Sequence, residues 1–394
     1  MKFSISSSRS SSTPSPPSNK QQPQQRNKSF VPSSPPSPTA IAGYAISNCI
    51  GRGSFSTVYK AHRNRGRYEV VAIKCIQISS LSKRSKENLI EEINILRRIN
   101  HENVVSMKKF TWDATNIYLI LDYCPGGNLA EFIRTKGRLS EFLVRHFAQQ
   151  LVQGLAVLHS ENIVHSDLKP ANILLSLPPV GSCRNVRLKI ADFGFSRRLD
   201  SNDSYTMGIK GSPLYMAPEV LNSQPYSGKA DLYSLGIILY ECLFGAAPYK
   251  TMDLGLLTKR ILSKDPIRVP KNADISDDCC DLLERLLVKD QTKRMDFEEL
   301  YRHQFIDIAH CPTMENYCKG VCMVKQATLL DNNRNYEDAR AFYVEGLRFL
   351  VPAYHWLGSF SDNQRKYLSG RIKDYFSRAE HIGGTMQLPA VKAN

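Results

Sequence analysis

Two short stretches of the chain carry polar residues that could act on a phosphate group. Residues 164–172, VHSDLKPAN, contain the Asp167 carboxylate, the Lys169 ammonium and the Asn172 amide, and Asp192 follows twenty residues later. Asp167 could accept the proton of a hydroxyl group, and Lys169 could neutralise the charge of a phosphate. Asn172 and Asp192 carry the oxygen ligands that magnesium prefers. This set of side chains suits the transfer of a phosphoryl group to a hydroxyl.

The segments ahead of these stretches could position a nucleotide. Strands are predicted between Tyr44 and Gln77, around a glycine-rich turn at residues 50–59, IGRGSFSTVY. Because glycine has no Cβ, the N–H groups of such a turn can approach phosphates closely. The turn alone is equally consistent with a plain hairpin. The apolar segment Val71-Ala72-Ile73-Lys74 favours a nucleotide, since its lysine could pair with phosphates, although a lone strand lysine can also be merely exposed.

The spacing of apolar residues predicts the elements that surround these motifs. Helices are predicted over Ser85–Ile99 and Glu141–Ser160, and short strands over Ile117–Asp122 and Val186–Ala191. The apolar run Leu232–Tyr249 contains polar residues and is short for a membrane span, so it predicts a buried helix. The two phosphate-directed stretches are therefore expected between packed helices and strands.

Taken in order, these segments resemble the protein kinase family. The family has a nucleotide loop G-x-G-x-x-G-x-V, a strand V-A-I-K, a catalytic loop H-R-D-L-x-x-x-N, and the motifs D-F-G and A-P-E, the last matched by Ala217-Pro218-Glu219. The lysine at position 169 and the serine before a proline at position 212 resemble the pattern of serine/threonine kinases rather than that of tyrosine kinases. Two positions depart from the pattern: Ser166 stands where the catalytic loop has arginine, and Ser56 where the nucleotide loop has its third glycine.

The resemblance implies an α+β, two-lobed kinase fold, with an antiparallel sheet plus a helix in the N-terminal lobe and a helical C-terminal lobe. It implies ATP and Mg²⁺ as cofactors. Asp167 and Lys169 are the implied catalytic residues, and Asn172 and Asp192 the implied metal ligands. Glu92, rather than Glu87 or Glu91, keeps the family spacing for pairing with Lys74. The residues implied to bind the nucleotide are Ile50, Gly51, Gly53, Val58, Ala72, Lys74, Glu92, Leu121, Asp122 and Cys124.

Some of these residues would act through the backbone or through other residues. Residues 122–127 are similar to the hinge between kinase lobes, where backbone groups receive the adenine, and Leu121 would lie behind it. Asp231 resembles the buried family aspartate that supports the backbone of the catalytic loop. Arg294 is placed to pair with Glu219. We expect Asp231, Arg294 and Glu219 to have structural rather than chemical roles.

Ser166 motivates a regulatory hypothesis. The arginine usual at this position binds a phosphate on the activation segment, and serine has no charge with which to do so. We therefore expect activity to depend little on phosphorylation of that segment, where Ser204, Tyr205 and Thr206 are candidate sites. Ser166 is also compatible with a catalytically weak or silent kinase-like adaptor. The intact Lys74 favours an active enzyme.

The C-terminal part predicts a three-helix bundle, with helices over Cys318–Asn332, Tyr336–Trp356 and Ser361–His381. Residues 335–347 and the segments Gln364-Arg365-Lys366 and 375–380 resemble the microtubule-interacting-and-transport (MIT) domains. That resemblance implies a groove that takes peptide helices from ESCRT-III subunits. The alternative is a regulatory bundle docked on the kinase.

The combination of the two modules resembles the Unc-51-like, autophagy-initiating serine/threonine kinases, and within them the branch that carries MIT domains. Two motifs are close in sequence to those of that group: GSPLYMAPE at residues 211–219 and DFGF at residues 192–195. The resemblance implies a place in autophagy, in ESCRT-III-linked abscission or in Hedgehog-type signalling, and interaction with the autophagy machinery. Phosphorylation of serine or threonine in protein substrates is the implied reaction.

Composition sets the remaining expectations. The formal net charge is +15, which suggests acidic partners or simply a solvated basic surface, and no sequence signature of a nucleic-acid-binding fold accompanies it. The ten cysteines form no C-x-x-C pair and are expected to be reduced thiols in a cytoplasmic protein without a transmembrane segment. The predicted organisation is a disordered Ser/Pro-rich basic tail at 1–42, a kinase domain at 43–306, a linker at 307–316, the bundle at 317–382 and a flexible C-terminus at 383–394.

Overall fold

The structure is a computed structural model, and it describes residues 40–53, 56–63, 68–176, 186–199, 212–249, 251, 253–270 and 273–383. The predicted two-lobed kinase fold followed by a helical bundle is confirmed. The candidate phosphorylation sites Ser204, Tyr205 and Thr206, the tip of the glycine-rich turn at residues 54–55, and nearly all of the two terminal segments lie outside the described residues.

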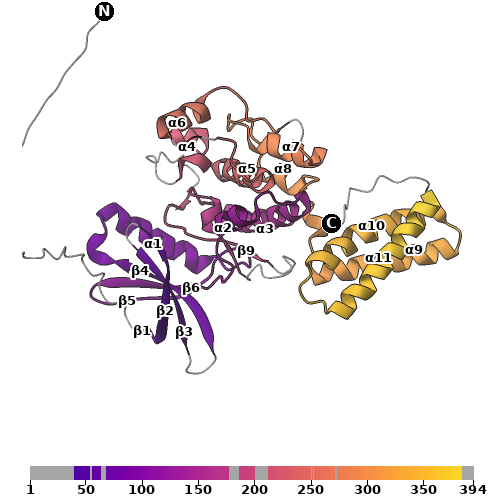
Figure 1. Ribbon diagram of the computed structural model, residues 1–394, viewed down its shortest axis with the longest axis horizontal. Helices are drawn as coiled ribbons and strands as arrows, with labels where there is room; N and C mark the ends of the chain where they lie inside the picture. Colours follow the sequence, from indigo (N-terminus) through magenta and orange to yellow (C-terminus); the bar gives the residue numbers. More distant parts are fainter. Residues whose placement is uncertain are drawn as a thin grey trace, which may run out of the picture. The chain divides into compact units, whose positions relative to one another are not determined.

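The N-terminal lobe is a six-stranded antiparallel sheet with one long helix (Figure 1). The strand order is β1-β2-β3-β4-β6-β5. The bounds are β1 Ala40–Ile41, β2 Tyr44–Arg52, β3 Ser56–Arg63, β4 Glu69–Gln77, β5 Met107–Trp112 and β6 Asn116–Asp122. Helix α1, Lys83–Arg98, begins two residues before its predicted start because the Ser82 hydroxyl accepts a hydrogen bond from the Ser85 N–H and caps it.

The C-terminal lobe packs its helices around α5, Lys229–Phe244, nearly all of which is buried, as predicted for its apolar run. Helix α3, Glu141–Ser160, has its predicted bounds and leads into the catalytic loop. Beside the loop run the short strands β7 Ile163–Val164, β8 Ile173–Leu175, β9 Leu188–Ile190 and β10 Arg197–Arg198. The other helices are α2 Leu129–Lys136, α4 Pro218–Leu221, α6 Leu254–Leu262, α7 Asp277–Leu286 and α8 Phe297–Arg302, with short 3₁₀ turns at 170–172, 213–215 and 308–310.

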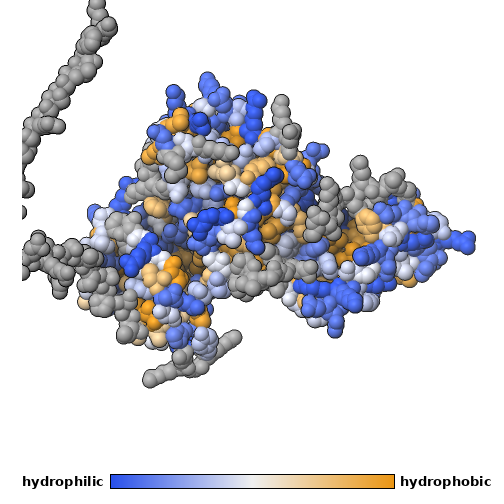
Figure 2. Space-filling model, viewed as in Figure 1, coloured by the Kyte–Doolittle hydropathy of each residue, from blue (hydrophilic) through white to orange (hydrophobic). Residues whose placement is uncertain are grey.

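Three long helices form the C-terminal bundle: α9 Met314–Asn332, α10 Tyr336–Trp356 and α11 Asp362–Gly383. Its core includes Val324, Ala339, Tyr343, Leu350 and Leu368. On the viewed face the surface of these helices is mostly hydrophilic (Figure 2), as expected when apolar stripes face inward. The bundle therefore has a hydrophobic core of its own, separate from the large core of the catalytic domain.

Candidate active site

The glycine-rich turn joins β2 and β3 as an antiparallel pair in which Gly51 lies opposite Val58. The Gly53 N–H donates to the Ser56 carbonyl at 2.8 Å and closes the turn. Among the described residues, which leave out the tip of the turn, a Cβ atom placed on Gly51 would meet the Val58 side chain at 3.8 Å, which is an ordinary contact.

Lys74 on β4 stands between two carboxylates that come from other parts of the chain. Its Nζ lies 2.6 Å from Glu92 Oε1 on α1 and 3.1 Å from Asp192 Oδ1. Burial opposes the charge of Lys74, but Glu92 and Asp192 outweigh it, so the lysine pKa is raised. Lys74 in turn holds the pKa of Asp192 below its usual range. The cluster thus presents a permanent ammonium and a permanent carboxylate.

Asp167 is the centre of a second network. Its Oδ2 accepts from Lys169 Nζ at 2.7 Å and from Asn172 Nδ2 at 3.1 Å, and its Oδ1 accepts from the Ser212 N–H at 3.2 Å. The Asn172 amide also donates to the Asp167 carbonyl at 2.9 Å. Both of these bonds use the amide nitrogen of Asn172, so neither occupies its amide oxygen. The predicted residues of this loop are therefore brought together, and Ser212 joins them through its backbone.

A buried aspartate stabilises the backbone of the catalytic loop. Asp231 on α5 accepts from the backbone N–H groups of His165, at 2.7 Å, and Ser166, at 3.0 Å. The His165 ring lies against the buried Phe193 ring, with centroids 5.2 Å apart. Ser166 adopts a left-handed backbone, with φ at 65°, which the two bonds to Asp231 stabilise.

The side chain of Ser166 faces a tyrosine. Its hydroxyl lies 3.3 Å from the Tyr226 hydroxyl. In this chain the position that usually carries a phosphate-binding arginine thus makes a neutral contact. Arg197 on β10 lies next to the same loop, but its guanidinium contacts Asn88 on α1.

The predicted hinge follows β6. The carboxylate of Asp122 is engaged away from the nucleotide position: it accepts from Lys189 Nζ at 3.0 Å and from the Ser106 N–H at 3.3 Å. The contact of Lys189 was not predicted from the sequence, because no local pattern around it indicates a partner 67 residues away. Within the described residues no hydrogen bond engages the main chain of Cys124. The hinge therefore offers backbone groups rather than the Asp122 side chain.

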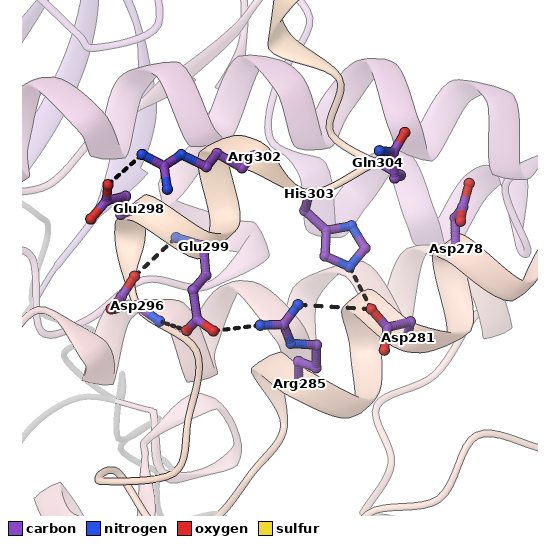
Figure 3. A pocket seen from close by; sticks show the side chains of 9 residues that line it. All are labelled: Asp278, Asp281, Arg285, Asp296, Glu298, Glu299, Arg302, His303 and Gln304. Atoms are coloured by element: carbon purple, nitrogen blue, oxygen red, sulfur yellow. Dashed lines mark hydrogen bonds and ion pairs between the residues drawn. The ribbon is translucent and has the colours of Figure 1, made fainter.

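The structural pair expected from the sequence is present. Arg294 and Glu219 form a bidentate ion pair at 2.7 and 3.0 Å, and both side chains are fully buried. A substantial cavity lies in the same lobe but away from the candidate site. It has a volume of about 380 Å³ and lies between α7 and α8. Figure 3 shows that its acidic side chains are largely paired with Arg285, Arg302 and His303, and none of the predicted site residues lines it.

Comparison with known proteins defines the class. Residues 44–306 match the protein kinase domain family, and residues 317–383 match the MIT (microtubule interacting and transport) domain family. The serine/threonine-protein kinase ULK3 of Xenopus laevis is 41% identical in an alignment that covers 88% of this chain and 72% of that protein. ULK3 of Homo sapiens is 41% identical over 88% of this chain and 71% of the relative. ATG1c of Arabidopsis thaliana is 40% identical over 68% of this chain and 36% of the relative.

The chain therefore belongs to the protein kinase family, and within it to the Unc-51-like serine/threonine kinases. Both the kinase family and the Unc-51-like branch were expected from the sequence. Membership implies protein substrates and the use of ATP with a divalent metal. Among the described residues, no helix is long and apolar enough to cross a membrane.

Proposed function

We propose that this kinase transfers the γ-phosphate of ATP, with Mg²⁺, to serine or threonine hydroxyls of proteins, and that the two clusters around Lys74 and Asp167 perform the transfer. The observation that carries the proposal is the Lys74 contact with both Glu92 and Asp192. These three residues come from a strand, a helix and a loop far apart in the sequence. A purely structural lysine would not need two carboxylates, one of which, Asp192, is about half exposed.

The proposed roles follow from the geometry. Asp167 orients the substrate hydroxyl and accepts its proton as the hydroxyl oxygen bonds to the γ-phosphorus, while the bond from that phosphorus to the bridging oxygen breaks and ADP leaves. Lys169, 2.7 Å from Asp167, is close enough to neutralise charge on the same phosphate. Lys74, held by Glu92, pairs with the phosphates nearer the nucleoside.

The donor set also fits a hard cation. Asp192 is an ionised carboxylate whose side chain is about half exposed, and Asn172 has an amide oxygen that its two bonds to Asp167 do not use. Carboxylate and amide oxygens are the ligands that Mg²⁺ takes in such sites, where it neutralises phosphate charge when bound. We therefore propose Asn172 and Asp192 as its ligands.

For the nucleotide we propose a position between the glycine-rich turn and the hinge. Gly51 and Gly53 support this, because a residue without a Cβ lets the backbone N–H groups of the turn approach phosphates closely. Ile50, Gly53, Val58, Ala72 and Leu121 would enclose the base and phosphates. The backbone between Asp122 and Cys124 would receive the adenine.

The test is magnesium-dependent transfer of phosphate from ATP to a generic Ser/Thr substrate. Lys74→Met and Asp192→Ala are expected to lower the rate at least about a hundredfold, because each removes a charge that stabilises the transferred phosphate. Lys86→Met is the matched control, since Lys86 is an exposed lysine on α1. Loss of transfer in this control, or full activity in Lys74→Met, would refute the assignment.

For the bundle we propose that it binds peptide helices of ESCRT-III subunits, and that the kinase acts in the cytoplasm in autophagy, abscission or Hedgehog-type signalling. The MIT match and the similarity to ULK3 and ATG1c support this proposal. Binding of labelled ESCRT-III C-terminal peptides to the full chain tests it directly. If the chain bound these peptides but transferred no phosphate, the kinase-like adaptor would be the better description.

A further inference from the structure

The last residue of α10, Trp356, contacts the catalytic domain. Its ring stacks on His146 of α3, with centroids 4.1 Å apart and planes 4° from parallel. It also stacks on Phe142, one turn earlier on α3, at 5.2 Å. Trp356 therefore covers two aromatic residues on the outer face of the helix that leads into the catalytic loop.

His146 shows that this contact is a buried one. His146 is only 7% exposed, and its Nδ1 has no hydrogen-bond partner among the residues that the structure describes. Burial lowers the pKa of His146 to about 3, so the ring is neutral. A neutral imidazole stacked parallel to an indole is an apolar contact, which is favourable only when water is excluded from it.

A second contact is ionic and joins the bundle to the segment that follows the catalytic domain. His310 lies between two carboxylates, with Nδ1 2.6 Å from Asp307 Oδ1 and Nε2 2.9 Å from Glu345 Oε1 on α10. Arg348 on α10 reaches the same two carboxylates, at 3.4 Å from Asp307 and 3.2 Å from Glu345. The Phe349 ring covers the His310 ring at 4.3 Å. We call these five residues the His310 cluster.

The stretch between the domains is itself bonded to both. On α3, Gln149 donates to the Asp307 carbonyl at 3.5 Å and Gln153 donates to the Cys311 sulfur at 3.4 Å. The Asn316 amide on α9 donates to the carbonyls of Ala309 and Cys311, each at 2.9 Å. Cys311 is buried. A segment tied down at these points does not act as a free tether.

From these contacts we infer that the C-terminal bundle docks on the outer face of α3 through Trp356 and the His310 cluster, and that it moves with the catalytic domain as one body. A partner bound to the bundle is then held at a fixed distance from Asp167. Substrates would be selected by that distance as well as by the sequence around the phosphorylated residue.

Tryptophan fluorescence of the full chain tests the docking. The chain has two tryptophans, and Trp112 is 67% exposed on β5, so Trp112→Phe leaves Trp356 as the only indole. We expect a blue-shifted emission that acrylamide quenches poorly. His146→Ala in this background should shift the emission to the red and raise the quenching constant severalfold. Emission typical of a solvent-exposed indole in the Trp112→Phe protein would overturn the proposal. So would an emission maximum and a quenching constant that His146→Ala leaves unchanged.

Small-angle scattering supplies a readout that does not depend on the indole. Trp356→Ala combined with Arg348→Glu is expected to increase the radius of gyration of the full chain, while its circular dichroism stays that of a folded protein. Tyr367→Ala is the matched control, because Tyr367 is 72% exposed on α11 and should change neither readout. An unchanged radius in the folded double variant would show that the two contacts do not hold the bundle.

Discussion

Ser166 is the residue at which this kinase departs most from the usual catalytic loop. Its hydroxyl contacts Tyr226, and its backbone is held by Asp231. Neither interaction needs a phosphate on the activation segment. At this position the loop is therefore held by a neutral contact and by a backbone bond to Asp231, both within the C-terminal lobe.

We predict that treatment with a phosphatase lowers the transfer rate of the wild-type protein by no more than about twofold, since a serine gains nothing from a phosphate that only a cation would bind. The rate is measured before and after treatment, with removal of phosphate checked by mass spectrometry. The Tyr226→Phe variant controls for the local hydroxyl pair. A loss of activity that returns on rephosphorylation would contradict the hypothesis.

The partner of Lys74 could be predicted from the sequence because the spacing of a motif fixes it. Glu92 was chosen over Glu87 and Glu91, and it is Glu92 that is buried and contacts Lys74. The partners of Asp122 could not be foreseen in the same way. They come from β9 and from the start of β5, and no local pattern encodes a pairing made by the fold.

At the scale of elements, α9 and α10 approach each other closely at two glycines. A Cβ on Gly346 would lie 2.6 Å from Val324 Cγ1, and one on Gly320 would lie 2.8 Å from Phe349 Cβ. Contacts this short cannot form without separating the helices. The three helices themselves were predicted within a few residues, because their apolar spacing is local, whereas the closeness of α9 to α10 was not.

We predict that Gly346→Ala destabilises the bundle by about 1–3 kcal/mol, because the added methyl group overpacks the contact between the helices. Chemical denaturation followed by circular dichroism measures the change. Gly370→Ala on α11 is the matched control: its Cβ would meet nothing within 4 Å, so the better helix propensity of alanine should leave stability equal or higher by up to about 1 kcal/mol. Equal effects of the two substitutions would refute this view of the packing.

At the scale of the whole molecule, two histidines near the α3–bundle contact respond to acid in opposite directions. Burial lowers the pKa of His146 to about 3, below the 6.5 of an unfolded histidine. The pKa of His310 is raised, because Asp307 and Glu345 outweigh the effect of its burial. His146 therefore favours the folded state above pH 6.5 and loses that contribution as the pH falls towards 3. His310 favours it below pH 6.5 and loses its contribution as the pH rises through the folded pKa.

We predict that His146→Phe reduces the fall in the free energy of unfolding as the pH drops from 6.5 to 4. The slope against pH changes by at most about 1.4 kcal/mol per pH unit, the limit for one proton. Phenylalanine keeps an aromatic face for Trp356 but cannot take up a proton in the unfolded chain. Free energies of unfolding across this range, compared with the wild type, measure the effect. His310→Gln should act with the opposite sign, destabilising most at the acidic end. A parallel pH dependence in all three proteins would contradict both assignments.

The ion pair between Lys74 and Glu92 has a thermodynamic consequence for the whole enzyme. In this structure α1 already stands where the pair needs it, with Asp192 alongside. A protein whose binding-competent state is only a small fraction of the population has its apparent affinity reduced by that fraction. The nearer the population with this pair formed is to the whole, the nearer the affinity for ATP is to the intrinsic affinity of the site, and the less an activator gains by moving α1. Control of where the kinase is held and which proteins reach it then gains in weight.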